Sequence, residues 1–390
     1  MTFEWTSEQL KELRGALTAK EIVQQPEMWI KTLKLIGSMK EKLSRYINEI
    51  IMQPDFEVIF TGAGTSEYVG ASVSVALNGI LKQRTHAYGT TDLVVAPQKY
   101  FSQEKPTLLV SFARSGNSPE SVGAVQAANK ICKKIYHLFI TCNEEGALEK
   151  IAEEQERCLT IILPKETLDQ GFAMTSSFSC MYLAVLLAFQ LEKLEVLSET
   201  VYEISRQAKR LLAEDWKIFR KAVKEYSFDR IVYLGSGAMK GISQEASLKM
   251  LELNGGKIAA FFETPMGFRH GPKSVINDST LCVVFISDDS YTKRYEIDLV
   301  RELCRQRQKN RIMIIGNHAD RQMVGLPDYE YYFLCREELP GEWLGLAGVV
   351  CAQLMAFFKS IDNGIHPDTP CENGNVNRVV KGVTIYPYGE

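Results

Sequence analysis

Short apolar segments alternate with longer amphipathic segments along most of the chain. The apolar segments FEVIF, TLLVSF, YHLFI and CLTIIL, each rich in branched or aromatic residues, lie between residues 56 and 163. RIVYLGSG, TLCVVFIS, RIMIIG and YEYYFLC repeat the pattern between residues 230 and 335. Buried strands that alternate with helices are typical of a parallel sheet covered by helices. The pattern therefore predicts an α/β protein with two such sheets.

Three other segments have different patterns. Residues 1 to about 50 carry apolar residues at helical spacing, with a break near Pro26, and predict helices. The charged amphipathic stretch after residue 195 has few strand formers and predicts connecting helices. The last stretch is rich in Pro, Gly and Asn, which favours a packed tail over a domain. The expected parts are a helical extension (1–50), a first α/β domain (51–195), connecting helices (196–228), a second α/β domain (229–360) and a C-terminal tail (361–390).

The two α/β regions share a local pattern. EVIFTGAGTSEYVGASVSVAL and RIVYLGSGAMKGISQEASLKM each read as strand, Gly-x-Gly turn and helix, and their first glycines, Gly62 and Gly235, lie 173 positions apart. This repetition indicates a duplicated nucleotide-fold-like unit. In an open parallel sheet, ligands bind beyond the carboxyl ends of the strands, so these turns are candidate binding sites.

Charge and membrane signals exclude several classes of function. The 390 residues are 45% hydrophobic and 24% charged, which is the composition of a folded protein of about two domains. Forty-five basic and 48 acidic residues give a net charge of −3, without a basic run or helix-turn-helix that would bind nucleic acid. The N-terminus lacks the pattern of a signal peptide, and no window is expected to reach the length that spans a bilayer. We therefore expect a cytoplasmic protein with neither nucleic-acid nor membrane partners.

The nine cysteines support the same compartment. Their number is odd, and they are scattered without C-x-x-C spacing. Most are expected to be buried small hydrophobic residues in a reducing environment.

Two Ser- and Gly-rich turns in the first region could hold an anion. GAGTSE and SFARSGNSPES each follow a predicted strand and open a helix, the second helix at a proline, so backbone N–H groups and hydroxyls converge there. One such turn is as often structural as ligand-binding, but two at neighbouring strand ends form one pocket. Hydroxyls without nearby lysines favour a monophosphate, and no P-loop motif is present. The candidate phosphate-binding residues are Gly64, Thr65, Ser66, Arg114, Ser115 and Ser118.

This pair of turns resembles the sugar isomerase (SIS) domain. The doubled unit resembles the isomerase half of glucosamine-6-phosphate synthase over nearly the whole chain after residue 50. The resemblance implies two tandem SIS domains of flavodoxin-like, three-layer type and assigns phosphate binding to Thr65, Ser66, Ser115 and Ser118. Ala113 and Arg114 stand where the family usually has serine and glutamine.

The same resemblance implies catalytic residues in the second half. SLKMLELN resembles the family's ALKLKE helix, which makes Glu252 the base that moves a proton between sugar carbons, with Lys249 stabilising charge nearby. A Lys/Glu pair at this spacing is otherwise an exposed ion pair. GFRHGP resembles ELKHGP and implies that His270 opens the sugar ring, although a lone histidine is usually structural. In the related enzymes this histidine comes from the partner subunit, which implies a homodimer with shared sites and leaves a tetramer open.

Two further segments resemble substrate-contacting parts of the family. NRVVKGVTI resembles the tail RNLAKSVTV and implies that Lys381 enters the site, where the alternative is a solvated lysine. DQGFAMTSSFS resembles a pocket-closing loop and implies substrate contacts from Phe172, Ala173 and Thr175, with Ser176 in place of the usual lysine. This chemistry needs neither a metal nor an organic cofactor.

The chain has no glutamine amidotransferase segment before its first SIS unit, unlike the synthase. Its length and N-terminal helices resemble the bacterial AgaS group. The resemblance implies conversion of galactosamine 6-phosphate to tagatose 6-phosphate and ammonia by ring opening and C2–C1 proton transfer. The alternatives are a sugar-phosphate aldose–ketose isomerase, a fructosamine-phosphate deglycase and a non-catalytic sugar-phosphate-binding regulator.

Overall fold

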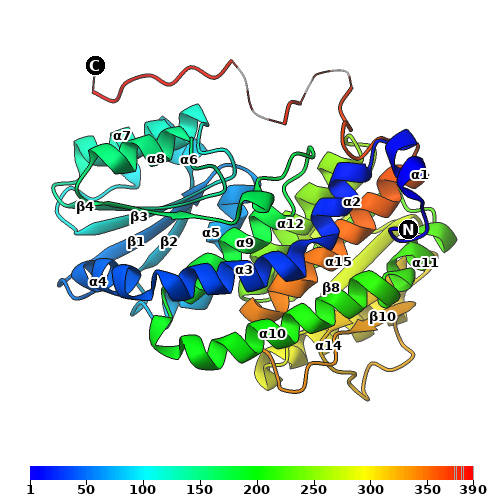
Figure 1. The fold of residues 1–390 in the computed structure, drawn as a ribbon. Helices are drawn as coiled ribbons and strands as arrows, with labels where there is room; N and C mark the ends of the chain where they lie inside the picture. Colours follow the sequence, from blue (N-terminus) through cyan, green and yellow to red (C-terminus); the bar gives the residue numbers. More distant parts are fainter. Residues whose placement is uncertain (373, 375, 379, 381, 390) are drawn as a thin grey trace. The chain divides into compact units, whose positions relative to one another are not determined.

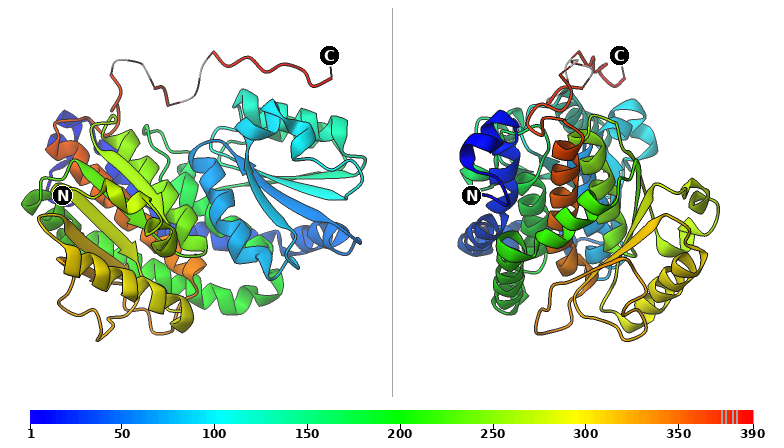
Figure 2. Two further views of the ribbon diagram at one scale, coloured as in Figure 1. Left: turned by 180° about the vertical axis from the view of Figure 1, so that it is seen from behind. Right: turned by 90° about the vertical axis from the view of Figure 1, so that its right-hand side faces the viewer.

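The computed structural model describes residues 1–372, 374, 376–378, 380 and 382–389, which form two compact units (Figure 1). Unit 1 contains Met1–Pro26, Gln170–Thr175 and Thr200–Asn375, and unit 2 contains Glu27–Asp169, Ser176–Glu199 and Val376–Glu390. Each unit is built around one five-stranded parallel sheet with helices on its faces (Figure 2). The predicted α/β fold class with two parallel sheets is confirmed.

The sheet of unit 2 has the strand order β2-β1-β3-β4-β5, which is the flavodoxin-type order. Every residue of the central strands β1 and β3 is buried, as expected where helices cover both faces of a parallel sheet. The strands are β1 (Glu57–Gly62), β2 (Thr85–Gly89), β3 (Thr107–Ala113), β4 (Ile135–Thr141) and β5 (Cys158–Ile162).

Helices cover both faces of this sheet. On one face, Ile59, Leu109 and Phe139 form a core with α6, α7 and α8, and on the other face α5 packs against Phe60. Helix α9 is buried along its whole length. The helices here are α3 (Gln25–Ser38), α4 (Lys40–Ile51), α5 (Thr65–Asn78), α6 (Thr90–Val95), α7 (Pro119–Ile131), α8 (Ala147–Glu154) and α9 (Ser176–Ala188), with 3₁₀ turns at Pro97–Lys99, Lys165–Thr167 and Leu191–Lys193.

The sheet of unit 1 repeats this topology, with the order β7-β6-β8-β9-β10. Its strands are β6 (Arg230–Leu234), β7 (Ala259–Glu263), β8 (Thr280–Phe285), β9 (Arg311–Gly316) and β10 (Tyr329–Tyr332). Its helices are α1 (Ser7–Glu12), α2 (Ala16–Val23), most of α10 (Leu194–Arg210), α11 (Lys217–Glu225), α12 (Ala238–Leu253), α13 (Pro265–Phe268), α14 (Ser290–Gln306) and α15 (Gly341–Asp362), with a π-helical turn at Leu211–Asp215 and a 3₁₀ turn at Pro272–Val275. Helix α14 packs on one face of the sheet, and α12 packs against α15.

The predicted duplication is visible in the geometry of the two glycine turns. A Cβ atom on Gly62 would lie 2.5 Å from the backbone of Ser66, and one on Gly235 would lie 2.5 Å from the carbonyl of Met239. Gly64 and Gly237 have nearly equal φ angles of 55° and 57°, in the region that favours glycine. Both turns therefore need glycine at the same two positions: the first because the backbone comes too close for a side chain, and the second because φ is positive.

Two strands were not predicted from the sequence. β2 and β7 each lie at an edge of a sheet, and most of their residues are only partly buried or exposed. A partly exposed edge strand does not need a continuous apolar run, so THAYG and AAFFE lack the signal that identified the central strands.

Helix α15 corrects one expectation from the sequence. By length and composition it could cross a membrane, and it is the one such helix among the described residues, so the expectation that no window reaches this length is wrong. In this structure 94% of its most apolar window is buried inside the protein. It packs against α2, α11 and α12 of unit 1, and a helix surrounded by others is hydrophobic on all sides.

The prediction that most of the cysteines are buried is confirmed. None of the nine cysteines is paired, and six are buried.

Candidate functional site

The two predicted phosphate turns lie side by side in unit 2. β1 and β3 are neighbouring parallel strands, with Thr61 opposite Ser111. Because parallel neighbours end at the same edge of the sheet, the turn after Gly62 and the turn after Ala113 meet there. The structure thus places all six candidate phosphate-binding residues at the same edge of this sheet.

The first turn leads into the N-terminus of α5. Gly64 occupies the N-cap position, and no side chain caps the helix. Thr65 and Ser66 form its first turn, and each has only 5% of its surface exposed. Helix N-termini present N–H donors and a positive dipole end, which favours an anion at this point.

The second turn is held by its own hydrogen bonds. The amide of Asn143 donates to the carbonyl of Ser115 at 2.8 Å, and Ser115 Oγ accepts from the N–H of Asn117 at 3.3 Å. The buried Arg114 donates from Nη2 to the carbonyl of Arg378, in the C-terminal segment, at 2.8 Å. Arg114 therefore ties this turn to the tail, a role that no sequence pattern indicated.

Ser118 has a structural role in this turn. Its Oγ caps α7 by accepting from the N–H of Ser121 at 3.3 Å, and it donates to Ser121 Oγ at 2.6 Å. In this structure the Ser118 hydroxyl therefore serves the start of α7.

An acidic residue that sequence reasoning missed lies in the first turn of α5. Glu67 is partly buried, and burial together with the neighbouring Asp92 raises its pKa above the ordinary value for a carboxyl. A higher pKa favours the neutral form, which repels a phosphate less than a carboxylate does. Glu67 is the last residue of the GAGTSE segment, and this position beside Thr65 and Ser66 could have identified it from the sequence.

The two equivalent turns of unit 1 lack the hydroxyls of Thr65, Ser66 and Ser115. Ala238 and Met239 stand at the positions of Thr65 and Ser66, and Asp288 stands at that of Ser115. Asp288 is buried and accepts from the amide of Asn317 at 2.8 Å and from the N–H of Leu339 at 2.7 Å. A carboxylate in this position repels an anion, so the duplicated turn serves the fold instead.

The predicted catalytic pair lies on α12 and combines a buried lysine with a partly exposed carboxylate. Lys249 is fully buried, and its Nζ lies 3.4 Å from Glu245 Oε1 and forms a hydrogen bond with Glu252 Oε2. The side chain of Glu252 is 25% exposed. A buried ion pair costs more to desolvate than a surface pair, so this arrangement differs from the exposed pair that the spacing alone suggests.

His270 lies in the turn that follows α13 and is exposed. Its backbone N–H donates to the carbonyl of Gly267 at 2.9 Å, and Thr264 caps the helix through the N–H of Gly267. The backbone of the turn is thus held by local hydrogen bonds while the imidazole faces outward.

The predicted pocket-closing loop, Gln170–Thr175, belongs to unit 1. Ala173 and Thr175 are buried, and Phe172 is partly buried. The Asp169 carboxylate, directly before the loop, accepts from the N–H of Ser177 at 2.8 Å and from its hydroxyl at 2.6 Å. Lys381 lies outside the described residues, so its predicted role stays a prediction.

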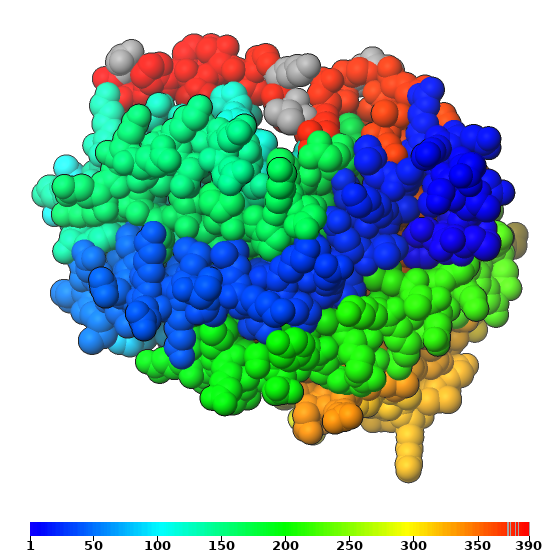
Figure 3. Space-filling view, viewed as in Figure 1, coloured from blue at the N-terminus to red at the C-terminus, as the bar shows by residue number. Residues whose placement is uncertain are grey.

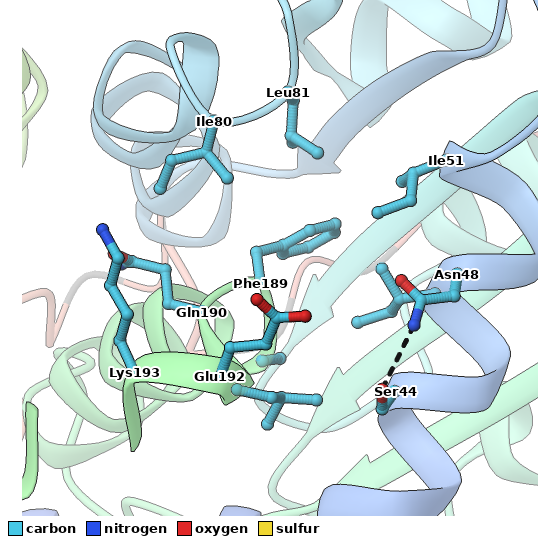
Figure 4. Close-up of a pocket in the computed structure, with 12 residues that line it drawn as sticks. Ser44, Asn48, Ile51, Ile80, Leu81, Phe189, Gln190, Glu192 and Lys193 are labelled. Carbon is cyan, nitrogen blue, oxygen red and sulfur yellow. Dashed lines mark hydrogen bonds between the residues drawn. The ribbon is translucent and has the colours of Figure 1, made fainter. Parts of the chain in front are cut away.

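A cavity of about 240 Å³ in unit 2 lies away from these turns (Figure 4). It is lined by α4, by residues 80 and 81 beyond the far end of α5, and by residues 188–193. Since α5 starts at the carboxyl edge of the sheet, its far end lies at the opposite edge. Figure 4 shows Asn48 bonded to Ser44 there, and none of the candidate site residues lines this cavity.

Comparison with known proteins decides the family. The SIS domain matches residues 50–191 and 226–358. The chain belongs to the SIS domain family. The two SIS matches contain the two parallel sheets, so the predicted tandem SIS fold is confirmed.

The most informative SIS relatives match almost from end to end. D-galactosamine-6-phosphate deaminase AgaS of Shewanella sp. (strain ANA-3) is 39% identical over 386 residues, covering 98% of this chain and 95% of the relative. A Clostridium novyi NT protein assigned as a tagatose-6-phosphate ketose/aldose isomerase has a TM-score of 0.97 and 42% identity, covering 100% of this chain and 99% of the other. The Escherichia coli tagatose-6-phosphate ketose/aldose isomerase has a TM-score of 0.89 and 36% identity, covering 96% of this chain and 98% of the other. The resemblance to the AgaS group is confirmed.

Proposed function

We propose that this protein is a sugar-phosphate deaminase/isomerase that converts galactosamine 6-phosphate and water to tagatose 6-phosphate and ammonia. The observation that carries the proposal is the Glu252 carboxylate held by a fully buried lysine in a chain that also has a serine- and threonine-lined anion turn. Burying a lysine is costly, and such groups gather at functional sites. Near full-length similarity to an AgaS deaminase supports the choice of substrate.

The proposed reaction uses the chain's own side chains. His270 assists opening of the sugar ring, which frees the C1 aldehyde next to the C2 amine. Glu252 removes the proton from C2 and returns it at C1, and Lys249 keeps the carboxylate in place and stabilises charge. The product is a C2 imine, which water hydrolyses to the ketose and ammonia. Thr65, Ser66 and Ser115 hold the phosphate, so that a small substrate stays fixed during proton transfer.

The substitution Glu252→Gln tests the base. Ammonia release from galactosamine 6-phosphate should fall by about 10²- to 10⁴-fold, because the amide cannot accept the C2 proton. Binding of the substrate, measured by calorimetry, should change little, since the phosphate ligands are intact. Lys240→Gln, an exposed change on the same helix, is the matched control and should keep full activity. Wild-type ammonia release by the Glu252→Gln protein would exclude Glu252 as the base.

A second candidate is aldose–ketose isomerisation without loss of nitrogen. The names of the two solved relatives favour it, and it uses the same C2–C1 proton transfer. Ammonia formation from galactosamine 6-phosphate supports deamination, whereas turnover of tagatose 6-phosphate without any amine supports plain isomerisation. A fructosamine-phosphate deglycase would release a free amino acid or amine from its own substrate, and a regulator would turn over none of these compounds.

We also propose that the active form is a homodimer in which His270 serves the partner's site. The stretch that contains His270 follows the edge strand β7, whose free side could pair with another chain. Phe261, Phe262 and Met266 are 39%, 36% and 42% exposed, so this stretch has apolar surface that a second copy could cover.

We propose a cytoplasmic location for the protein. The nine unpaired cysteines support a reducing compartment, the cytoplasm.

A further inference from the structure

A buried carboxylate from the N-terminal helices holds the backbone of the 170–175 loop. Glu21 lies on α2 and has 5% of its surface exposed. Its Oε1 accepts from the N–H of Gln170 at 2.5 Å and from that of Gly171 at 3.0 Å, and its Oε2 lies 3.2 Å from the same Gly171 nitrogen. Hydrogen bonds from N–H groups to an ionised carboxylate are about twice as strong as neutral ones.

Gly171 makes this contact possible. A Cβ atom at this position would lie 2.8 Å from Glu21 Oε2 and 3.2 Å from Thr18 Oγ1. The backbone of the loop therefore lies directly against α2, and glycine is the residue that permits this approach.

Helix α2 is itself held in place within unit 1. The Asp368 carboxylate accepts from the N–H of Thr18 at 2.8 Å and from its hydroxyl at 2.6 Å, at the first turn of the helix. Just beyond α2, the buried Gln25 donates to Gln353 of α15 at 2.7 Å. Glu21 therefore projects from a helix that is held at both ends.

We propose that Glu21 is a positioning residue for substrate: it fixes the loop that presents Phe172, Ala173 and Thr175. This inference rests on the proposed function, because the loop contacts the sugar only if the chain acts on a sugar phosphate. The two N–H groups that Glu21 holds directly precede Phe172, so their loss would free the backbone on which that side chain is mounted. A displacement of about 1 Å in a substrate-positioning group can reduce the rate about 10²-fold.

The experiment compares Glu21→Ala with Glu21→Gln in the full-length protein. The glutamine carbonyl oxygen still accepts both N–H groups, whereas alanine accepts neither. Hydrogen exchange of the 170–175 segment should be about tenfold faster in Glu21→Ala and within about threefold of wild type in Glu21→Gln. The kcat/KM for ammonia release from galactosamine 6-phosphate should fall about 10- to 100-fold in the alanine variant, and the glutamine variant should restore most of it. Lys20→Ala, an exposed neighbour on α2, should alter neither measurement.

The outcomes separate this inference from the proposed function. Unchanged exchange in Glu21→Ala overturns the positioning role whatever the enzyme does. Faster exchange with an unchanged kcat/KM also overturns it, since Glu21 would then act on the fold alone. A wild-type protein that releases no ammonia from amino-sugar phosphates refutes the proposed function itself, and the inference falls with it.

Discussion

Single residues of this protein carry charge states that depend on burial. His137 on β4 is almost fully buried, its Nε2 lies 2.7 Å from Asn129 Oδ1, and its ring stacks on Phe139 with a centroid distance of 5.6 Å. Burial lowers the pKa of His137 to about 4. Desolvation without a carboxylate partner favours the neutral imidazole, so this histidine is a packing residue.

The lowered pKa predicts acid sensitivity. An unfolded histidine titrates near pH 6.5, so between pH 6.5 and about pH 4 the unfolded state binds a proton that the folded state does not. The free energy of unfolding therefore falls by roughly 3 kcal/mol as the pH drops across this window. Denaturant unfolding of wild type and His137→Leu at several pH values isolates this residue, because other groups contribute to both proteins. Relative to wild type, the variant should gain stability as the pH falls, and parallel curves would contradict the assignment.

At the scale of the element, the turn from β1 to α5 shows how the fold builds a candidate anion site from backbone. Gly62 lets Ser66 approach, Gly64 takes a positive φ, and the helix then begins with two hydroxyl residues. The turn from β6 to α12 has the same geometry without the hydroxyls.

The C-terminal segment is a further element of unit 2, and Figure 3 shows its red residues over the surface near α7, where Ile385 lies against Gly123.

The paired turns supply a matched test. Gly62→Ala and Gly235→Ala each place a Cβ atom 2.5 Å from a backbone atom that cannot move freely, so both should lose about 1 to 3 kcal/mol of stability. Only Gly62→Ala shifts Thr65 and Ser66. We expect it to weaken galactosamine 6-phosphate binding at least about tenfold, while Gly235→Ala stays within about threefold of wild type. Calorimetry at a temperature where both variants are folded measures the difference, and equal losses would show that the first turn does not hold the phosphate.

At the scale of the whole molecule, the two copies of the unit have divergent chemistry. Unit 2 keeps the hydroxyl-lined turn, and unit 1 has an aspartate there but carries the Lys249–Glu252 pair on the following helix. In the proposed function, unit 2 supplies the phosphate ligands and unit 1 supplies the base.

A mixing experiment tests the proposed dimer. If His270 serves the partner's site, a hybrid of Glu252→Gln and His270→Ala subunits contains one site with both residues intact and one with neither. Random mixing makes half of the dimers hybrids, so activity should return to about 25% of wild type from two inactive proteins. Co-expression with two different affinity tags purifies the hybrid for direct assay. An inactive hybrid that is nevertheless formed would place His270 in the same chain as its Glu252.

The sequence by itself determined the features that are written in local pattern. Central strands such as β1 and β8 are buried on both faces, so they need continuous apolar runs, and Pro26 and the glycine turns leave signals within a few residues. The motif around Glu252 identified a candidate residue but not its surroundings.

Tertiary structure decided whatever depends on residues far apart in the chain. Lys249 is buried because helices α12 and α15 pack together, and the same spacing on an exposed helix would give a solvated pair. Helix α15 has the composition of a membrane span and lies in a protein core because other helices surround it. Glu21 meets Gly171 across 150 positions of sequence, and no periodicity encodes that contact. Local pattern reports how one segment prefers to fold, whereas burial and pairing are set by which other segments pack against it.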